Sequence, residues 1–282
     1  MAFKEYDYLN DSFLHEIERL SNNNLNIYYL IHAYFSVSKG GKGSYDAWIF
    51  EESNSWAIGL RIDERYLIYG NNCDDLIISK IHERIDNNEV EYLSGFHFCG
   101  TKVILDKLMI KANFDFEVYK ERYYYTLEKD NFIPIINDQN ILIRKSIISD
   151  LSVIAKMNSD FNTEEWNGKN NRSVEDFESL IKEGVKSGKF FLVEFNNEVV
   201  GFCSVMNFLS KVDNMIGTVY ISDTHRNQNL GTHLLSSVVN NQLDYAEEIY
   251  LMTDIQNLPS NKMVKNLGFE KNYEYSDLIF KK

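Results

Sequence analysis

The second half of the chain alternates short apolar runs with amphipathic segments in a regular order. Apolar residues spaced by three predict a helix over 149–158, and Ser173 with Asp176 three residues later has the capping-box pattern that opens a second helix. Two apolar runs on either side of Asn196-Asn197 predict a hairpin. The expected order is β-α-α-β-β-β-α-β-α-β, with strands at 141–145, 189–195, 198–206, 215–221 and 248–252, further helices from about 231 and over 260–267, and a terminal strand.

The first half repeats the last part of this pattern. From Trp48 onward its apolar runs predict the order β-β-β-α-β-α-β, ending in a long aromatic strand over 114–127. The shared order suggests a degenerate duplication. A polar, Asn-rich stretch at 129–140 separates the halves and contains Pro134, one of only two prolines. We therefore expect two domains, residues 1–135 and 141–282.

The composition is that of a folded globular protein. Of the 282 residues 44% are hydrophobic, and 18 Tyr and 18 Phe supply large core side chains. No apolar run approaches the roughly 20 residues that a membrane helix needs, and the N-terminus shows no secretory signal. The formal net charge is −13, with 29 basic against 42 acidic residues, which argues against nucleic-acid binding. We expect a cytoplasmic protein with neither nucleic-acid nor membrane partners.

The cysteines and histidines form no metal-site pattern along the sequence. Cys73, Cys99 and Cys203 are far apart and odd in number, which fits small buried side chains in a reducing compartment better than a disulfide framework. Five histidines likewise lack metal-ligand spacing, namely His15, His32, His82, His97 and His233. We expect structural roles for these side chains and no metal site.

The most informative segment runs from residue 219 to residue 235. An apolar strand leads into a short polar loop that holds Arg226, and Gly231 stands at the start of an amphipathic helix. The unpaired N–H groups of a first helical turn, together with the helix dipole, attract anions, and an arginine adds a charge-assisted bond to phosphate. Glycine lets the backbone approach such an anion closely. The pattern predicts a phosphate-binding loop, although a plain strand-to-helix turn has a similar signature.

The loop Arg226-Asn-Gln-Asn-Leu-Gly-Thr232 resembles motif A of the GNAT N-acetyltransferases, in which a Gln/Arg-x-x-Gly-x-Gly/Ala segment wraps the pyrophosphate of acetyl-CoA. Asn229 replaces the first glycine, and asparagine tolerates a left-handed backbone better than most residues. Thr232 replaces the last small residue. The resemblance implies that acetyl-CoA is bound by Val219, Tyr220, Ile221, Arg226, Asn227, Gln228, Asn229, Leu230, Gly231 and Thr232.

A second resemblance follows at the expected distance. Residues 254–269 look like motif B, in which an Asn after the fifth strand precedes a helix that ends in Leu-Gly-Phe. The resemblance implies that Asn257 contacts the pantetheine arm and that Ser260 faces the cofactor. By itself, Leu267-Gly-Phe269 indicates no more than a helix C-cap.

The GNAT resemblance covers roughly residues 141–282. The first half is similar to the degenerate N-terminal domain of tandem GNAT proteins, and its equivalent loop, 70–74, lacks the arginine and the spaced glycine. We expect no cofactor there. The expected fold class is α/β (α+β), with two GNAT-like domains, each a mixed, mostly antiparallel central sheet flanked by helices.

The implied reaction is acetyl transfer from a thioester to an amine. A backbone N–H near 219–221 would stabilise the charge that develops on the thioester oxygen. The amine must lose a proton, yet residues 216–219, where family members often place a glutamate, are Ile, Gly, Thr and Val. Asp223 and His225 lie just beyond and are the remaining candidates for the base, although a loop aspartate is commonly a turn residue.

The usual general acid of the family is also absent. Where family members commonly have a tyrosine in the motif B helix, this chain has Val264. Water can protonate the departing thiolate instead, because a thiol pKa lies near ~8.5. Tyr220, Tyr273 and Tyr275 are alternative donors, although a packing or surface position is the plainer interpretation of each.

The segment between the first two helices of the second half contains Glu164, Glu165 and Trp166. Two carboxylates beside an aromatic ring suit an ammonium group through charge and cation–π contact, and the resemblance places acceptor contacts here. An exposed helix end with acidic caps is the plainer interpretation.

The implied function is an acetyl-CoA-dependent N-acetyltransferase that acts on a primary amine of a small molecule or peptide, as a monomer or homodimer and without a metal. The absent base and Val264 leave a non-catalytic acyl-CoA-binding or sensing protein as the alternative. A longer acyl donor also stays open. Turnover separates the N-acetyltransferase from the sensing protein, because a sensor binds the cofactor without consuming it.

Overall fold

The computed structural model of the chain describes residues 2–6, 11–21, 30, 45–62, 64–87, 95–113, 115–136, 139–168, 172–207 and 213–281. The chain forms two compact units that are discontinuous in sequence. Unit 1 contains Met1–Tyr124, Asp254–Gln256 and Asn272–Lys282, and unit 2 contains Tyr125–Thr253 and Asn257–Lys271. The helices in the described ranges are all too short or too polar to span a lipid bilayer.

The second half has the element order that its hydrophobic pattern predicts. Its elements are β7 (Ile141–Lys145), α5 (Leu151–Glu165), α6 (Val174–Lys186), β8 (Phe190–Phe195), β9 (Glu198–Asn207), β10 (Asp213–Ile221), α7 (Leu230–Gln242), β11 (Glu248–Asp254), α8 (Leu258–Asn266) and β12 (Glu270–Lys281). Short 3-10 helices of the described ranges include Lys129–Asn131, Ile148–Asp150 and Asp223–His225.

Two of the local signals are confirmed in detail. Ser173 caps α6, since its hydroxyl accepts from the N–H of Asp176 while the Asp176 carboxylate accepts from the N–H of Ser173. Asn196 and Asn197 both have positive φ, 52° and 66°, as a tight hairpin turn between β8 and β9 requires. The prediction for the first helix was too short, because α5 continues to Glu165 rather than ending at residue 158.

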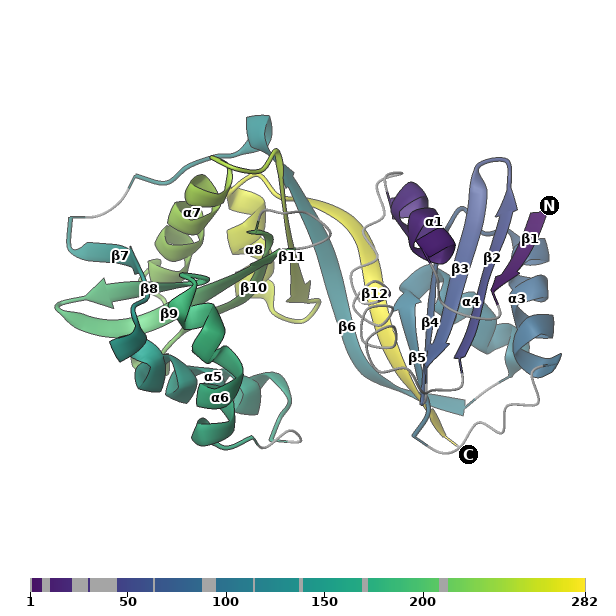
Figure 1. The fold of residues 1–282 in the computed structure, drawn as a ribbon, viewed down its shortest axis with the longest axis horizontal. Helices are drawn as coiled ribbons and strands as arrows, with labels where there is room; N and C mark the ends of the chain where they lie inside the picture. The colour runs from purple at the N-terminus through teal and green to yellow at the C-terminus, as the bar shows by residue number, and fades with distance from the viewer. Residues whose placement is uncertain are drawn as a thin grey trace. The chain divides into compact units, whose positions relative to one another are not determined.

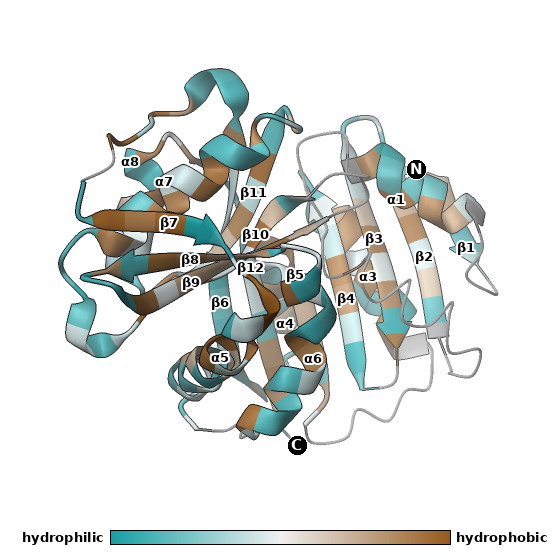
Figure 2. Ribbon diagram, turned by 60° about the vertical axis from the view of Figure 1, so that its left-hand side comes forward, coloured by the Kyte–Doolittle hydropathy of each residue, from teal (hydrophilic) through white to brown (hydrophobic). Residues whose placement is uncertain are grey.

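The sheet of unit 2 has the strand order β6-β11-β10-β9-β8-β7, where β6 is Asp115–Glu128. The pair β10–β11 is parallel, and the recorded pairs β9–β10, β8–β9 and β7–β8 are antiparallel. Helices α5 and α6 lie on one face of this sheet, and α7 and α8 lie on the other (Figure 1). Figure 2 shows β7, β8 and β9 mostly in the hydrophobic colour; β8 and β9 supply buried core residues such as Leu192 and Phe202, whereas on the edge strand β7 Leu142 is 55% exposed.

Unit 1 also follows the predicted order from Trp48 onward. Its elements are β1 (Ala2–Tyr6), α1 (Asp11–Ser21), β2 (Tyr45–Glu52), β3 (Ser55–Ile62), β4 (Arg65–Asn71), α3 (Asp75–Asn87), β5 (His97–Thr101), α4 (Lys102–Ala112) and β6. Helices α3 and α4 pack on one face of its sheet around a core that includes Trp48, Tyr66 and Ile81. The strand order is β1-β2-β3-β4-β5-β12-β6, in which β4 and β5 are parallel.

Two long strands belong partly to each unit. Strand β6 begins in unit 1 and its last residues, from Tyr125, lie in unit 2, whereas β12 begins in unit 2 and enters unit 1 at Asn272. Within unit 1, β12 pairs with β5 in an antiparallel register that places Asp277 opposite Cys99. The compact units therefore differ from a simple division of the chain at residues 135 and 141.

Gly268 is a position where we expect substitution to destabilise unit 2. It follows α8 with φ +96°, and a Cβ there would lie 2.0 Å from the backbone oxygen of Asn131. Gly268→Ala is expected to lower the free energy of unfolding by at least about 2 kcal/mol, because left-handed strain and a backbone clash add together.

Gly168→Ala is the matched control for this prediction. Gly168 also has positive φ, +72°, but nothing lies within 4 Å of its added Cβ. Its substitution introduces left-handed strain alone, about 1 kcal/mol. Urea denaturation compares the two, and equal losses of stability would contradict the proposed clash with Asn131.

Candidate functional site

The parallel strands β10 and β11 separate towards their C-terminal ends. Among the described residues, the recorded bridge between them pairs Met215 with Tyr250, near the start of β10. For the described residues of β10 beyond Met215, no further pair with β11 is recorded. The end of a parallel strand pair that opens in this way, next to a helix N-terminus, is a common ligand position in α/β folds.

A β-bulge changes the direction of β10 at the same place. Ile216 pairs with Val205 and Val219 pairs with Cys203, so β10 advances three residues where β9 advances two. The N–H of Thr218 donates to the side-chain oxygen of Ser204 at 2.8 Å rather than to a strand. The bulge lies immediately before Val219, the start of the segment expected to present a backbone N–H to a thioester.

The loop after β10 has the left-handed backbone conformation expected where asparagine stands in place of a motif glycine. Asn227 and Asn229 both have positive φ, 63° and 59°, and Asn229 is the N-cap residue of α7. The Asn229 side chain does not cap the helix, and the first turn of α7 contains no acidic residue. The first-turn N–H groups of Leu230 and Gly231 therefore meet no carboxylate of their own helix, which leaves the positive helix end available to an anion.

Gly231 has space for a small side chain only. A Cβ there would lie 3.5 Å from Cγ1 of Ile221 and 3.6 Å from the sulfur of Met263, which are ordinary contacts. Its φ is not in the left-handed region, so neither backbone strain nor close packing demands glycine at this position. A requirement for glycine would instead come from a ligand that lies against the backbone.

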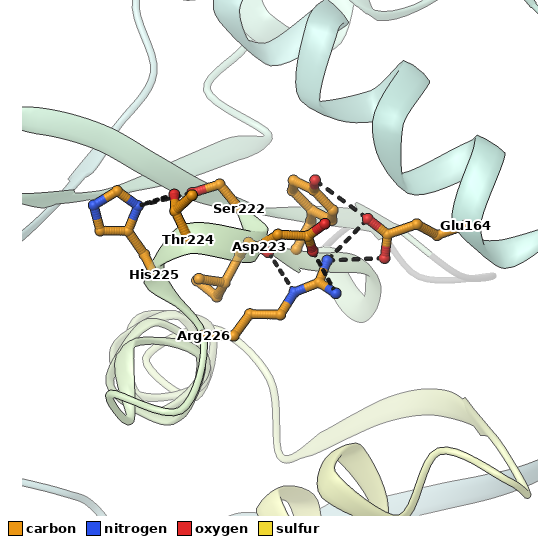
Figure 3. Close-up of polar contacts among 8 residues, drawn as sticks. Glu164, Ser222, Asp223, Thr224, His225 and Arg226 are labelled. Atoms are coloured by element: carbon orange, nitrogen blue, oxygen red, sulfur yellow. Dashed lines mark hydrogen bonds and ion pairs between the residues drawn. The ribbon is translucent and has the colours of Figure 1, made fainter.

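Arg226 is the centre of an ion-pair cluster (Figure 3). Its Nη2 lies 3.0 and 2.8 Å from the two carboxylate oxygens of Glu164, and its Nη1 lies 2.6 Å from Asp223. Its Nε donates to the carbonyl of Ile221 at 2.9 Å. Burial alone lowers the pKa of Arg226, but the hydrogen bond and charge of Glu164 and the charge of Asp223 raise it above the ordinary value.

Tyr220 lies beneath this cluster. The guanidinium carbon of Arg226 is 5.5 Å from its ring centroid, and its hydroxyl donates to Glu164 at 3.4 Å. Burial, followed by the charges of Glu164 and Asp160, raises the pKa of Tyr220 to about 12. A phenol with this pKa is a poorer acid than a thiol with a pKa near ~8.5. Tyr220 is therefore suited to donating a hydrogen bond to Glu164 and not to protonating a thiolate.

The two remaining candidates for the base point in different directions (Figure 3). Asp223 turns towards Arg226 and pairs with it. His225 lies on the other side of the loop, where its Nδ1 is 3.1 Å from the hydroxyl of Ser222 and 3.0 Å from that of Thr224. The geometry brings Asp223 to the cluster of Arg226 and Glu164 but does not bring His225 to it.

The acceptor candidates lie at the end of a helix, which corrects their expected position in a loop. Glu164 and Glu165 occupy the last turn of α5, and Trp166 is its C-cap residue, with its N–H donating to the carbonyl of Asn162. Within this helix Asn158 and Thr163 donate side-chain hydrogen bonds to carbonyls four residues earlier, Asn158 to Ile154 and Thr163 to Ser159, so these polar side chains are satisfied inside the helix. The contact of Glu164 with Arg226 was not anticipated from the sequence.

The motif B residues begin a helix beside β11. Asn257 is the N-cap of α8, and its side-chain oxygen accepts from the N–H of Ser260 at 3.1 Å. The cap uses the oxygen, so the amide nitrogen of Asn257 is the group that a pantetheine carbonyl would require. Val264 is buried, and Gly268 ends the helix with φ +96°, which confirms the C-cap interpretation of Leu-Gly-Phe.

A buried polar network at α8 was missed by the sequence analysis. The side-chain oxygen of Asn261 accepts from Tyr125 at 3.1 Å and also from Thr253. Asn261 is 6% exposed, and this pairing fixes the start of α8 against β6 and β11. The only sequence signal was a single asparagine in a helix, which predicts no partner 136 residues away.

The corresponding helix start in unit 1 is different. Asp74 caps α3 by accepting from the N–H of Ile77 at 2.9 Å, and Asp75 lies in the first turn. Lys107 donates to the carbonyl of Cys73, within a cavity of about 410 Å³. Two carboxylates at a helix N-terminus oppose a bound anion.

Comparisons with known proteins agree with this architecture. The model of the family described as "Acetyltransferase (GNAT) family" matches residues 151–269. A search of curated protein sequences finds no match. A GNAT-family acetyltransferase from Colwellia psychrerythraea shares the fold with a TM-score of 0.63 at 11% identity, covering 100% of both chains.

Two further structures have the same fold at similarly low sequence identity. A GCN5-related N-acetyltransferase from Sphaerobacter thermophilus has a TM-score of 0.56 at 13% identity and covers 87% of this chain and 84% of its own. A tandem GNAT protein from the clavulanic acid biosynthesis pathway has a TM-score of 0.51 at 10% identity, and the match covers 83% of this chain and 82% of that protein. Residues 151–269 are thus a domain of the GNAT acetyltransferase family, in a chain that has the fold of tandem GNAT proteins.

Proposed function

We propose that the chain is an acetyl-CoA-dependent N-acetyltransferase whose acceptor is a cationic primary amine of a small molecule or peptide. The observation that carries the proposal is the convergence of three features in unit 2: the open end of β10–β11, the bulge before Val219, and the carboxylate-free N-terminus of α7 after Arg226. Together these features offer backbone donors for a pyrophosphate and for a thioester oxygen.

Acetyl-CoA supplies an activated acetyl group to such a site. The ammonium group first loses one proton to a base or to water, and the free amine nitrogen then bonds to the acetyl carbon. The carbon–sulfur bond breaks, CoA departs as a thiolate, and the second nitrogen-bound proton that must leave goes to the thiolate or to water. The chain contributes orientation through residues 226–232 and Asn257, and a backbone N–H of residues 219–221 faces the developing charge.

The acceptor class follows from the charge around Tyr220. Glu164, Asp160 and Asp223 place three carboxylates near its ring, and Arg226 is the one cation recorded beside them among the described residues. If a phosphate takes Arg226, the surplus negative charge favours an ammonium group. Glu164 is then the carboxylate best placed to bind the amine and to accept its proton.

Arg226 should contribute directly to cofactor affinity. Arg226→Ala is expected to weaken acetyl-CoA binding roughly 10- to 100-fold, since a hydrogen bond to a charged group contributes about 1.5–3 kcal/mol. Arg226→Lys should recover only part of the loss, because an ammonium cannot form the bidentate contact. Calorimetric titration measures both variants, and unchanged affinity in Arg226→Ala would contradict a phosphate contact.

Catalysis is tested by turnover. Purified protein with acetyl-CoA and a panel of amines (a polyamine, amino acids, an aminoglycoside, a peptide) is expected to release free CoA thiol with at least one of them, together with the acetylated product by mass. Buried Val264, in place of a tyrosine, favours the second candidate, a non-catalytic acyl-CoA-binding protein. Binding without thiol release across the whole panel would support that alternative.

A further inference from the structure

Three potential metal-ligating side chains converge in unit 1, in a part of the molecule that the acetyltransferase proposal does not use. They are His97 and Cys99 of β5 and Asp277 of β12, and one ligand atom from each lies within 4.8 Å of the other two. Alternate residues of a strand share a face, so His97 and Cys99 point to the same side. Asp277 is the cross-strand partner of Cys99 and joins them there.

We propose that His97, Cys99 and Asp277 bind a single Zn²⁺ ion that links β5 to β12 in unit 1. Imidazole nitrogen, thiolate sulfur and carboxylate oxygen are the ligand types that zinc takes in proteins, and a thiolate disfavours Mg²⁺ and Ca²⁺. Three protein ligands leave a fourth tetrahedral position for water.

The distances are compatible with this assignment. Zinc–ligand bonds of about 2.0–2.3 Å place the ligand atoms of a tetrahedral site roughly 3.3–3.8 Å apart. In the structure His97 Nδ1 and Asp277 Oδ1 are 2.6 Å apart, at hydrogen-bond distance, and the ligand atoms of all three residues lie within 4.8 Å of one another. Side-chain adjustments of roughly 1 Å would admit the ion without moving either strand.

The charges balance when the ion is bound. A neutral imidazole, one thiolate and one carboxylate carry −2 in total, which a Zn²⁺ ion neutralises. Zinc binds the thiolate form of Cys99, so binding releases the thiol proton to solvent, and a neutral His97 then carries its single ring proton on the nitrogen that does not bind zinc.

The surroundings of the three side chains allow a zinc ion to enter and hold its ligands in position. The side chain of His97 is 19% exposed and that of Asp277 is 10% exposed, whereas Cys99 is buried, so an ion enters from the His97 side. The ring of Tyr119 packs edge-on to His97 at 5.4 Å, and Tyr275 hydrogen-bonds the Cys99 sulfur. Arg65 is paired in register with His97 on the neighbouring strand β4.

Sequence spacing does not reveal this cluster. His97 and Asp277 are 180 residues apart, and they meet because the last strand of the chain pairs with β5. The expectation of structural roles for His97 and Cys99 was drawn from spacing along the chain alone. His32, which the same expectation covered, lies outside the described residues.

The experiment adds zinc to chelator-treated, full-length protein. We expect one Zn²⁺ per chain by elemental analysis after gel filtration, and a rise in Tm of roughly 5–10 °C at a zinc concentration about 100 times Kd. With Co²⁺ as the probe, a thiolate-to-metal absorption band should appear. His97→Gln and Cys99→Ser should each weaken zinc binding at least about tenfold, and Cys99→Ser should abolish the cobalt band.

Matched controls separate this site from adventitious binding. His15→Gln changes an exposed histidine of α1, and Cys203→Ser changes a buried thiol in unit 2; both should retain the stoichiometry and the cobalt band. His97→Gln keeps the proposal testable if Cys99→Ser fails to fold, because His97 is partly exposed. Zinc binding that is equally strong in wild type, His97→Gln and Cys99→Ser, or no stoichiometric binding by wild type, would overturn the proposal.

Discussion

Gly231→Tyr is expected to abolish the binding of acetyl-CoA while leaving unit 2 folded. The added ring cannot be accommodated between Ile221 and Met263, where even a Cβ already makes contacts of 3.5 and 3.6 Å. It must turn outwards over the start of α7, where its bulk covers the first-turn N–H groups that are proposed to bind pyrophosphate. We expect a loss of affinity of more than about 100-fold, since those donors act together.

The control for this variant is Gly231→Ala. A methyl group meets only ordinary van der Waals distances, and the φ of Gly231 is compatible with alanine, so the fold should be retained. Circular dichroism establishes folding, and the acetyl-CoA-induced rise in Tm reports binding. Gly231→Tyr that folds and still shows the wild-type rise in Tm would show that the ligand does not lie against α7.

Glu164→Gln is expected to strengthen the binding of acetyl-CoA and at the same time to lower the catalytic efficiency for the amine. Glu164 occupies Nη2 of Arg226 in this structure, so it competes with any phosphate for that group. Neutralising it is expected to strengthen acetyl-CoA binding a few-fold. The same change should lower kcat/KM for the amine by roughly 10- to 100-fold, because the ammonium loses a charged partner.

A double-mutant cycle tests the first consequence directly. In an Arg226→Ala background, Glu164→Gln should no longer strengthen acetyl-CoA binding, since the competition has been removed. Glu183 is an exposed carboxylate on α6 that pairs with Lys186. Glu183→Gln therefore makes the same change in charge away from the site, and it should change neither the affinity for acetyl-CoA nor the kcat/KM for the amine. If Glu164→Gln weakens acetyl-CoA binding, Glu164 supports the cofactor site instead of competing with it.

Hydrophobic periodicity was sufficient to predict the elements because each unit buries its helices on a sheet. The order of the second half, the hairpin at Asn196-Asn197 and the capping box at Ser173 all depend on residues within a few positions of one another. The conformation of Asn229 was predictable for the same reason, since few residues tolerate a left-handed backbone.

Long-range pairing was not predictable from the same patterns. The two halves end in similar strands, so nothing local indicates that β12 pairs with β5 and that the end of β6 lies in unit 2. The Glu164–Arg226 pair depends on how far α5 continues, and its polar last turns gave a loop-like signal. The cluster of His97, Cys99 and Asp277 exists only because of the β12–β5 pairing.

The number of acetyl-CoA molecules bound per chain tests the central claim most directly. Calorimetric titration of acetyl-CoA into the wild-type protein is expected to give one site per chain, because the α7 N-terminus of unit 2 carries no carboxylate whereas Asp74 and Asp75 occupy the start of α3 in unit 1. A stoichiometry of one that falls to zero in Gly231→Tyr is the result that the account predicts. No binding, or one site that persists in Gly231→Tyr, would contradict it.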